Sequence, residues 1–272
     1  MRSILLHVDD DDCMEARLQV ALDLARQFDA HLTCLQAVAY EFGVAGDLYG
    51  TMAAQMAAIF RENADQVQET LEKRLSVEDV RWEWLRSEGR ATDQIARHAP
   101  LNDLVIVGAH NPAGRADFPS ILASDLAMEV RVPILVAPAG ATGFQLDRPA
   151  MIAWNGSAES ARALRAAMPM LARASEVHLL WVEEKKEKGR HDLSAADAAI
   201  YLARHRIEAI IDELHTDKGL SVADILRSAS EARNAAYLVM GAYGHSRLRE
   251  RILGGVTRDM LTDPKLPLLL TH

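Results

Sequence analysis

Two stretches of this 272-residue chain repeat one pattern of apolar run, glycine and turn, and this repeat constrains the fold more than any other feature of the sequence. Residues 103–110 and 237–243 each form a short apolar run that ends in Gly-Ala. Each is followed by a second apolar run that contains a proline, at 132–136 and at 266–270. Short apolar runs of this kind are typical of buried parallel strands. The repeat therefore predicts two copies of one domain.

The beginnings of the two halves match as well. An apolar strand at 4–8 leads into a helix-patterned stretch at 14–28, and a strand at 151–154 leads into another at 158–172. Aspartate, asparagine, glycine and serine at both steps are good turn and N-cap residues. Each half therefore starts with the same strand-to-helix unit.

The segments between these landmarks alternate between strand and helix patterns. In the first half we expect strands at 31–38 and 80–86 and helices at 51–75 and 90–99. In the second half we expect strands near 175–182 and 207–214 and helices near 192–205 and 220–232. Strands that alternate with helices imply parallel sheets with right-handed crossovers. The sequence therefore predicts an α/β fold of two tandem doubly wound domains, at 1–139 and 149–272, joined by a linker at 139–148.

The prolines make a further prediction about the sheets. Pro133 and Pro267 each lie near the start of the last strand of a half. Proline cannot donate a hydrogen bond to a strand ladder, so it suits an edge strand. We therefore expect both last strands at sheet edges.

Composition excludes several classes of partner. A net charge of −9 argues against nucleic acid or an anionic membrane surface. No apolar run approaches the roughly 18–20 residues that a membrane helix needs. Cys13 and Cys34 form neither a metal motif nor a redox motif, which favours a reducing, cytoplasmic setting. The acidic run Asp9–Asp12 suits a helix N-terminus better than a metal site, and we expect no metal there.

A glycine-rich segment of the second half is a candidate anion site. Gly241 and Gly244 open a loop after a strand, and a helix at about 256–261 starts after Gly254. Glycines let backbone N–H groups approach an anion, and a helix start adds free donors. The segment lies at the carboxyl end of a strand, where open α/β sheets bind ligands. The alternative interpretation is that these glycines only form turns in an α/β domain that binds no ligand.

This spacing resembles the motif of nucleotide-binding members of the universal stress protein family: glycine, two residues, glycine, nine residues, glycine. The resemblance covers essentially the whole chain as two copies. It implies a fold of the adenine-nucleotide α-hydrolase type and an ATP-binding stress-response protein, with ADP or AMP as other ligands. It implies phosphate and ribose contacts at Gly241, Gly244, Gly254 and Val256. It also implies an adenine pocket lined by Ala153, Val182 and Met240, with Asn155 at the polar position after the first strand of the second half.

Neighbouring residues extend this candidate site. His245 and Arg247 follow the loop and could neutralise phosphate charge, although a solvated helix face is an equal alternative. Thr257 could donate a hydroxyl to phosphate, and capping of the helix is favoured over this role. We name no catalytic residue.

Two residues of the second half depart from the family pattern. Gly255 stands where the family has serine or threonine, so one hydroxyl contact to phosphate is missing. A hydrogen bond to a charged group contributes about 1.5–3 kcal/mol, so its loss weakens binding about ten- to hundredfold. Asn155 replaces the usual aspartate and attracts magnesium less well than a carboxylate. We therefore expect binding with or without magnesium.

The first half departs further. Asn111 and Pro112 stand where the second glycine is expected, and Ser120 or Ile121 where the third is expected. Proline removes a donor N–H from such a loop. Asp9 and Gly108 are kept and make at most a weak second site. We interpret this domain as degenerate and structural.

The sequence is compatible with three functions. The leading one is a protein in which ATP acts as a conformational or assembly ligand of the second domain. A slow ATPase or phosphoryl-transfer enzyme needs a general base and a metal beside the γ-phosphate, and a nucleotide-free scaffold needs neither. The family resemblance also implies pairing through the last strands of the two halves, as an intramolecular pseudo-dimer that could associate further into homodimers.

Overall fold

The elements of the chain follow the predicted order. The computed structural model describes residues 1–38, 51–109, 120–183, 193–215, 219–242 and 255–272. The first half contains β1 (Ser3–Val8), α1 (Met14–Phe28), β2 (His31–Val38), α2 (Thr51–Leu75), β3 (Arg81–Glu88), α3 (Ala91–His98), η1 (Ala99–Leu101), β4 (Leu104–Gly108), α4 (Ile121–Glu129) and β5 (Ile134–Ala137). The second half contains β6 (Ala150–Trp154), α5 (Ala158–Leu171), β7 (Val177–Glu183), α6 (Ala195–Arg204), β8 (Ala209–His215), α7 (Val222–Ala232), β9 (Tyr237–Gly241), α8 (Gly255–Thr262) and β10 (Leu268–Thr271).

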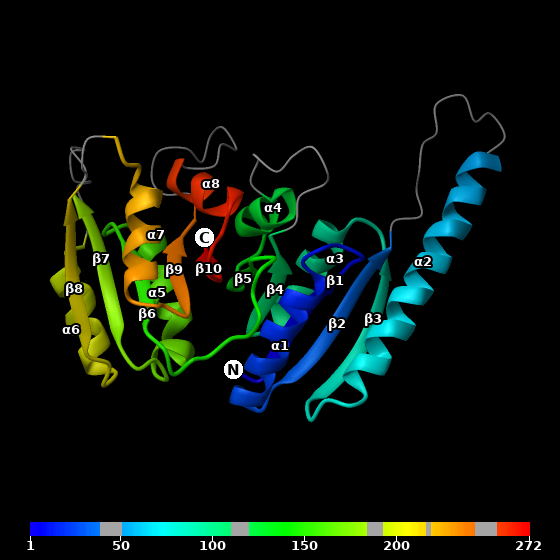
Figure 1. Cartoon of the computed structure of the whole chain (residues 1–272), viewed down its shortest axis with the longest axis horizontal. Helices are drawn as coiled ribbons and strands as arrows, with labels where there is room; N and C mark the ends of the chain where they lie inside the picture. The colour runs from blue at the N-terminus through cyan, green and yellow to red at the C-terminus, as the bar shows by residue number, and fades with distance from the viewer. Residues whose placement is uncertain (39–50, 110–119, 184–192, 216–218, 243–254) are drawn as a thin grey trace.

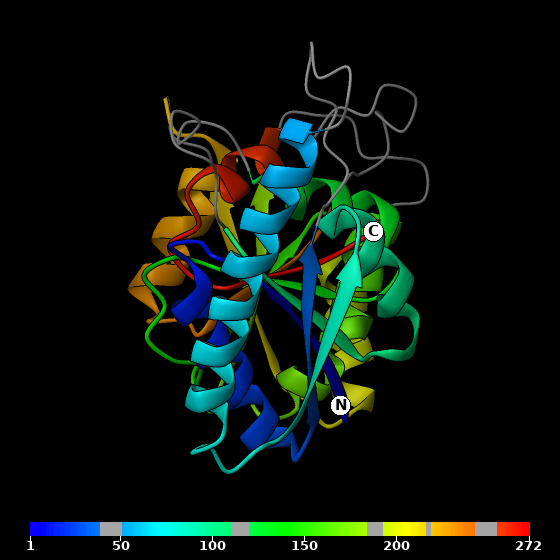
Figure 2. The same cartoon turned by 90° about the vertical axis from the view of Figure 1, so that its right-hand side faces the viewer.

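All these strands join one sheet in the order β3-β2-β1-β4-β5-β10-β9-β6-β7-β8 (Figure 1). Every pair within a half is parallel, as the alternation of strands and helices predicts. One apolar layer lies between the sheet and α1, α2, α5 and α6, and a second lies against α3, α4, α7 and α8. Figure 2 shows α2 beside the outer strands β2 and β3. The predicted doubly wound α/β class is confirmed.

Local sequence explains where the helices begin. Ser157 caps α5 by accepting a hydrogen bond from the Ser160 N–H at 3.1 Å. Helices α6 and α7 each start with a capping box, formed by a serine and the aspartate three residues later. Such caps satisfy N–H groups that no helical carbonyl can reach.

The prediction of edge strands holds only within each half, where β5 and β10 are the outermost strands. β5 and β10 lie in the middle of the ten-stranded sheet, where they pair with each other antiparallel, with Leu269 opposite Leu135. Each proline precedes its strand, so its missing N–H is not needed in the ladder. Its carbonyl is used instead: Pro133 accepts from Val105 N–H and Pro267 from Leu238 N–H, both at 3.0 Å.

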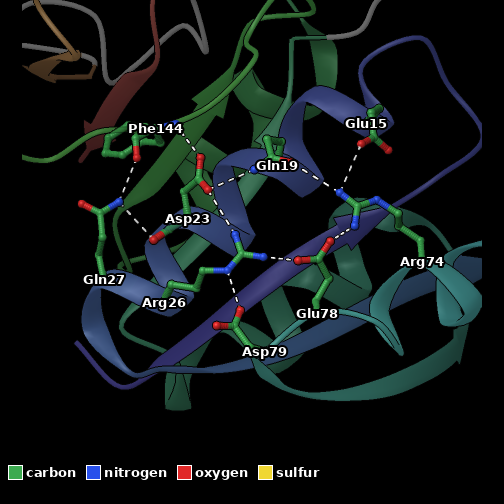
Figure 3. Close-up of polar contacts among 9 residues, drawn as sticks. All are labelled: Glu15, Gln19, Asp23, Arg26, Gln27, Arg74, Glu78, Asp79 and Phe144. Atoms are coloured by element: carbon green, nitrogen blue, oxygen red, sulfur yellow. Dashed lines mark hydrogen bonds and ion pairs between the residues drawn. The ribbon is translucent and has the colours of Figure 1, made fainter.

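The predicted linker packs against the first half (Figure 3). Phe144 N–H donates to Asp23 Oδ2 at 2.8 Å, and Gln27 Nε2 donates to the Phe144 carbonyl at 2.8 Å. Gln27 Oε1 also accepts from Leu146 N–H at 3.1 Å. The Phe144 ring stacks on Tyr237 of β9, with centroids 5.5 Å apart. The linker therefore bridges α1 of the first half and a core strand of the second.

Charged side chains of α1 extend this contact. Asp23 also accepts from Gln19 at 3.0 Å and pairs with Arg26 at 3.3 Å. Arg26 in turn pairs with Glu78 and Asp79 beyond the end of α2 (Figure 3). The linker contact is thus connected to the packing of α2 on α1.

Candidate functional site

The apolar residues expected to contact adenine lie on one face of the sheet. Ala153 of β6 is in register with Met240 of β9, and Val182 belongs to the neighbouring strand β7. These three residues and Val256 of α8 belong to the same apolar layer. Met240 is buried, whereas the other three are half-buried. Together they form an apolar wall of the kind that ligand pockets use for flat rings.

The polar residue beside this wall is held by a turn. Asn155 follows β6, is exposed, and accepts the Ser157 N–H on its Oδ1 at 3.2 Å. Gly156 between them has φ of 79°, which is favourable for glycine. Because α5 is capped by Ser157 itself, the Asn155 side chain is placed at the carboxyl end of the sheet by a rigid helix start.

Helix α8 supplies backbone donors next to the wall. It begins at Gly255, which is exposed, and a Cβ built on Gly255 meets no atom of the described residues within 4 Å. The first N–H groups of a helix have no partner within it and carry a partial positive charge. Thr257 in this first turn is buried. The arrangement is that of an anion site at a helix N-terminus.

The structure gives a packing reason for glycine at position 241 that the sequence did not reveal. A Cβ at this position would lie 2.6 Å from the Glu159 carbonyl carbon and 2.7 Å from Ser160 N. The close approach of α5 to the end of β9 therefore requires glycine here, whether or not a ligand binds. Four expected contacts, Gly244, His245, Arg247 and Gly254, lie outside the described residues.

The corresponding place in the first half is filled by its own side chains. His7 occupies the position on β1 that Ala153 occupies on β6, because both are the residue before the last of a central strand. His7 is 3% exposed, and its Nδ1 has no partner among the described residues. An imidazole thus stands where the second half has a methyl group. A histidine inside an otherwise apolar strand was the available sequence signal.

The helix start is also different in the first half. Ser120 caps α4 by accepting from Ala123 N–H at 3.4 Å, whereas the first residue of α8 is Gly255, which has no side chain. Ser120 is completely buried. The Ala123 N–H at the start of α4 is therefore already bonded to Ser120, and it is not available to bind an anion.

Of the two residues retained in the first half, Asp9 is exposed and Gly108 is required by packing. A Cβ on Gly108 would lie 2.7 Å from Arg17 Nη1 and from the Cys13 Cβ. Arg17 is buried, pairs with Asp11 at 2.7 Å and donates from Nε to the His7 carbonyl at 2.8 Å. Asp11 also accepts from Cys13 N–H at 2.7 Å. One aspartate of the acidic run thus orders the turn before α1 and neutralises a buried guanidinium.

Burial keeps His7 neutral and predicts an acid sensitivity. Burial, and next the charge of Arg17, lowers the pKa of His7 from 6.5 to about 3. Because the unfolded chain binds this proton more readily, the contribution of His7 to stability is present above pH 6.5 and is lost as pH falls toward 3. We expect a loss of about 1.4 kcal/mol per pH unit in this window.

The measurement is the free energy of unfolding in denaturant between pH 7 and pH 4. His7→Leu should remove this part of the slope, whereas His205→Leu, at an exposed position, should leave it unchanged. Equal slopes in wild type and His7→Leu would show that His7 does not cause the acid sensitivity.

Two hollows of the described surface lie away from this site. One, of about 350 Å³, lies at α7, α8 and the turn after them and is lined by Arg227, Arg258, Asp259, Thr262, Asp263 and Lys265. The other, of about 440 Å³, lies beside the linker and is lined by Gln27, Gln145, Leu146, Asp147 and Arg173. Neither contains an expected nucleotide contact. The candidate site is therefore defined by strand ends and a helix start.

The described residues contain neither a cluster of metal ligands nor a membrane-spanning helix. No group of three or more His, Cys, Asp or Glu side chains among them could hold a metal ion. Within the same part of the chain, no helix is long and apolar enough to span a membrane.

Comparison with known proteins identifies the family. Solved structures with similar folds include a universal stress protein from Archaeoglobus fulgidus DSM 4304, with a TM-score of 0.74, 14% identity, and coverage of 99% of this chain and 96% of that chain. A second is a functionally unknown protein from Pseudomonas aeruginosa PAO1, with a TM-score of 0.59, 16% identity, and coverage of 100% of this chain and 92% of that chain. A third is a putative universal stress protein from Pseudomonas aeruginosa UCBPP-PA14, with a TM-score of 0.56, 17% identity, and coverage of 100% of this chain and 93% of that chain. No curated protein sequence matches the chain. The sequence model of the universal stress protein family matches it twice, at residues 1–138 and 148–272. Since these matches cover nearly the whole chain, it belongs to the universal stress protein family as a tandem member.

Proposed function

We propose that this chain is a cytoplasmic, ATP-binding stress-response protein whose second domain, at 149–272, holds the nucleotide as a conformational or assembly ligand. The observation that carries the proposal is the start of α8. Its first residue is Gly255, its first turn carries no acidic side chain, and its Val256 belongs to the same apolar layer as the wall. Phosphate at the helix start and adenine on the wall would use both features.

We further propose that the first domain, at 1–139, is the structural partner. Its helix start is capped by Ser120, and His7 fills the position of Ala153. The antiparallel pairing of β5 with β10 supports an intramolecular pseudo-dimer of the two domains. A binding stoichiometry of one nucleotide per chain follows.

Two substitutions at Gly255 test the site in opposite directions. Serine fits, because a Cβ there meets no atom of the described residues within 4 Å, and its hydroxyl should tighten ATP binding about ten- to hundredfold. Aspartate fits equally and favours the helix, but it brings a negative charge to the phosphate site and should weaken binding about tenfold or more. The measurement is isothermal titration of nucleotide-stripped protein with ATP.

The first domain offers a matched control. Ile121 is the first residue of α4 and is 46% exposed, so Ile121→Asp makes the same kind of change at the other helix start. It should leave ATP binding unchanged. Binding that is lost in Ile121→Asp and kept in Gly255→Asp would move the site to the first domain, and no binding of ATP, ADP or AMP by the wild type would reject the proposal.

A further inference from the structure

The two outer strands of the sheet differ in how well they are protected. β3 and β8 end the strand order, so neither has a neighbour on its outer side among the described residues. β3 carries charged residues along its whole length, namely Arg81, Glu83, Arg86 and Glu88. β8 instead begins with Ala209, Ile210 and Ile211, and its acidic residues come later. Because charges on an edge strand hinder pairing with another chain, β8 is the more open edge of the two.

β8 exposes apolar side chains on both faces of the sheet. Ile210 is 49% exposed and Ile211 is 39% exposed. Ala209 packs in the apolar layer of α6 and Leu214 in that of α7, and side chains alternate along a strand. Ile211 therefore lies on the α6 face and Ile210 on the α7 face. An exposed apolar edge of this kind is a pairing site for another strand.

Covering both faces of β8 at once requires a partner with helices on both sides of a sheet. A single added strand would pair with the backbone of β8 but would bring no helix to either isoleucine. The chain itself shows the arrangement that does so, because β5 and β10 pair antiparallel and apolar layers continue across this joint on both faces. A second copy of this chain, which carries the same strand in the same setting, fits this surface.

Charges at the two ends of β8 set the direction of such pairing. Arg204 and Arg206 precede the strand and outnumber Glu208, whereas Glu213 lies near its end, and all four are exposed. Asp212 is already in an ion pair at 2.6 Å, so Glu213 carries the negative charge at that end. An antiparallel partner strand brings the basic start of one copy beside the acidic end of the other, whereas a parallel one sets like charges side by side. The surface is thus complementary to itself in the antiparallel direction.

We propose that two copies of this chain associate through β8, antiparallel and about a twofold axis, so that the ten-stranded sheet of one copy continues into that of the other. Each copy contributes the same strand, so the contact uses both β8 edges and stops at a dimer. Ile210 and Ile211 become buried in the contact. β8 contains none of the expected nucleotide contacts, so the dimer does not depend on the proposed nucleotide site.

Sedimentation of the full chain over a range of concentrations tests this surface. We expect a dimer at micromolar concentration. Ile211→Lys should raise its dissociation constant about 100-fold or more, because the lost apolar burial and the added charge occur twice in a twofold contact. Ile59→Lys is the matched control, because Ile59 is 56% exposed on α2, at the other end of the sheet from β8 (Figure 1), and it should leave the dimer unchanged.

A charge exchange tests the direction of the pairing. Arg206→Glu or Glu213→Arg alone should weaken the dimer about tenfold, and the two together should restore it. A monomeric wild type overturns the proposal, as does a dimer that Ile211→Lys leaves intact. A double exchange as weak as either single one rejects the antiparallel arrangement. Far-UV circular dichroism equal to that of the wild type shows that the variants are folded.

Discussion

Asp11→Ala is expected to lower the free energy of unfolding of this protein by about 3–5 kcal/mol. The substitution leaves Arg17 without its carboxylate partner, and the two side chains are only 1% and 5% exposed. A charge that deeply buried cannot recover its hydration when its partner is removed. The carbonyls of His7 and Asp9 still accept from Arg17, but they supply no compensating charge.

The control for this prediction lies in the same acidic run. Asp10 is exposed, so Asp10→Ala should change the free energy of unfolding by less than about 0.5 kcal/mol. Both values come from chemical denaturation at neutral pH. Similar losses in the two variants would mean that the run acts by its total charge, and that the Arg17 pair is not important.

Phe144→Ala should destabilise the whole chain by about 3–5 kcal/mol. Phe144 is 3% exposed and belongs to an apolar layer that contains α1 of the first half and Tyr237 of the second. Truncation removes the ring stacked on Tyr237 and leaves a cavity under α1. Phe144→Leu keeps most of the volume and should cost less than about 1.5 kcal/mol.

The shape of the unfolding curve is part of the same prediction. Because one layer is shared by both halves, we expect a single transition whose midpoint shifts as a whole. Two separate transitions, with only one of them shifted by Phe144→Ala, would contradict the role of the linker as a shared part of the core. Circular dichroism and tryptophan fluorescence should agree on the midpoint.

Local patterns determined most of the fold. The apolar runs and their spacing predicted α1 and α2 with the observed bounds, and most other elements within a few residues, because periodicity and capping residues act over short distances. The internal repeat and the glycine spacing also led to the family. Ala153, Val182 and Met240 were expected to line one pocket, and the structure places them in one apolar layer, together with Val256.

Only the tertiary structure decided the register in which the halves join and how their equivalent positions are packed. The family resemblance implied that the last strands pair, but the antiparallel register of β5 with β10 joins residues about half a chain apart, and no local pattern of either strand shows it. The same is true of the linker contact with Asp23 and Gln27, and of the ion pair that buries Arg17. The sequence by itself determined two similar domains and one nucleotide-type motif. The packing of distant segments decided that the His7 side chain is buried at the end of β1, whereas the smaller Ala153 is half-buried at the equivalent place on β6. Burial depends on neighbours that only the folded chain brings together.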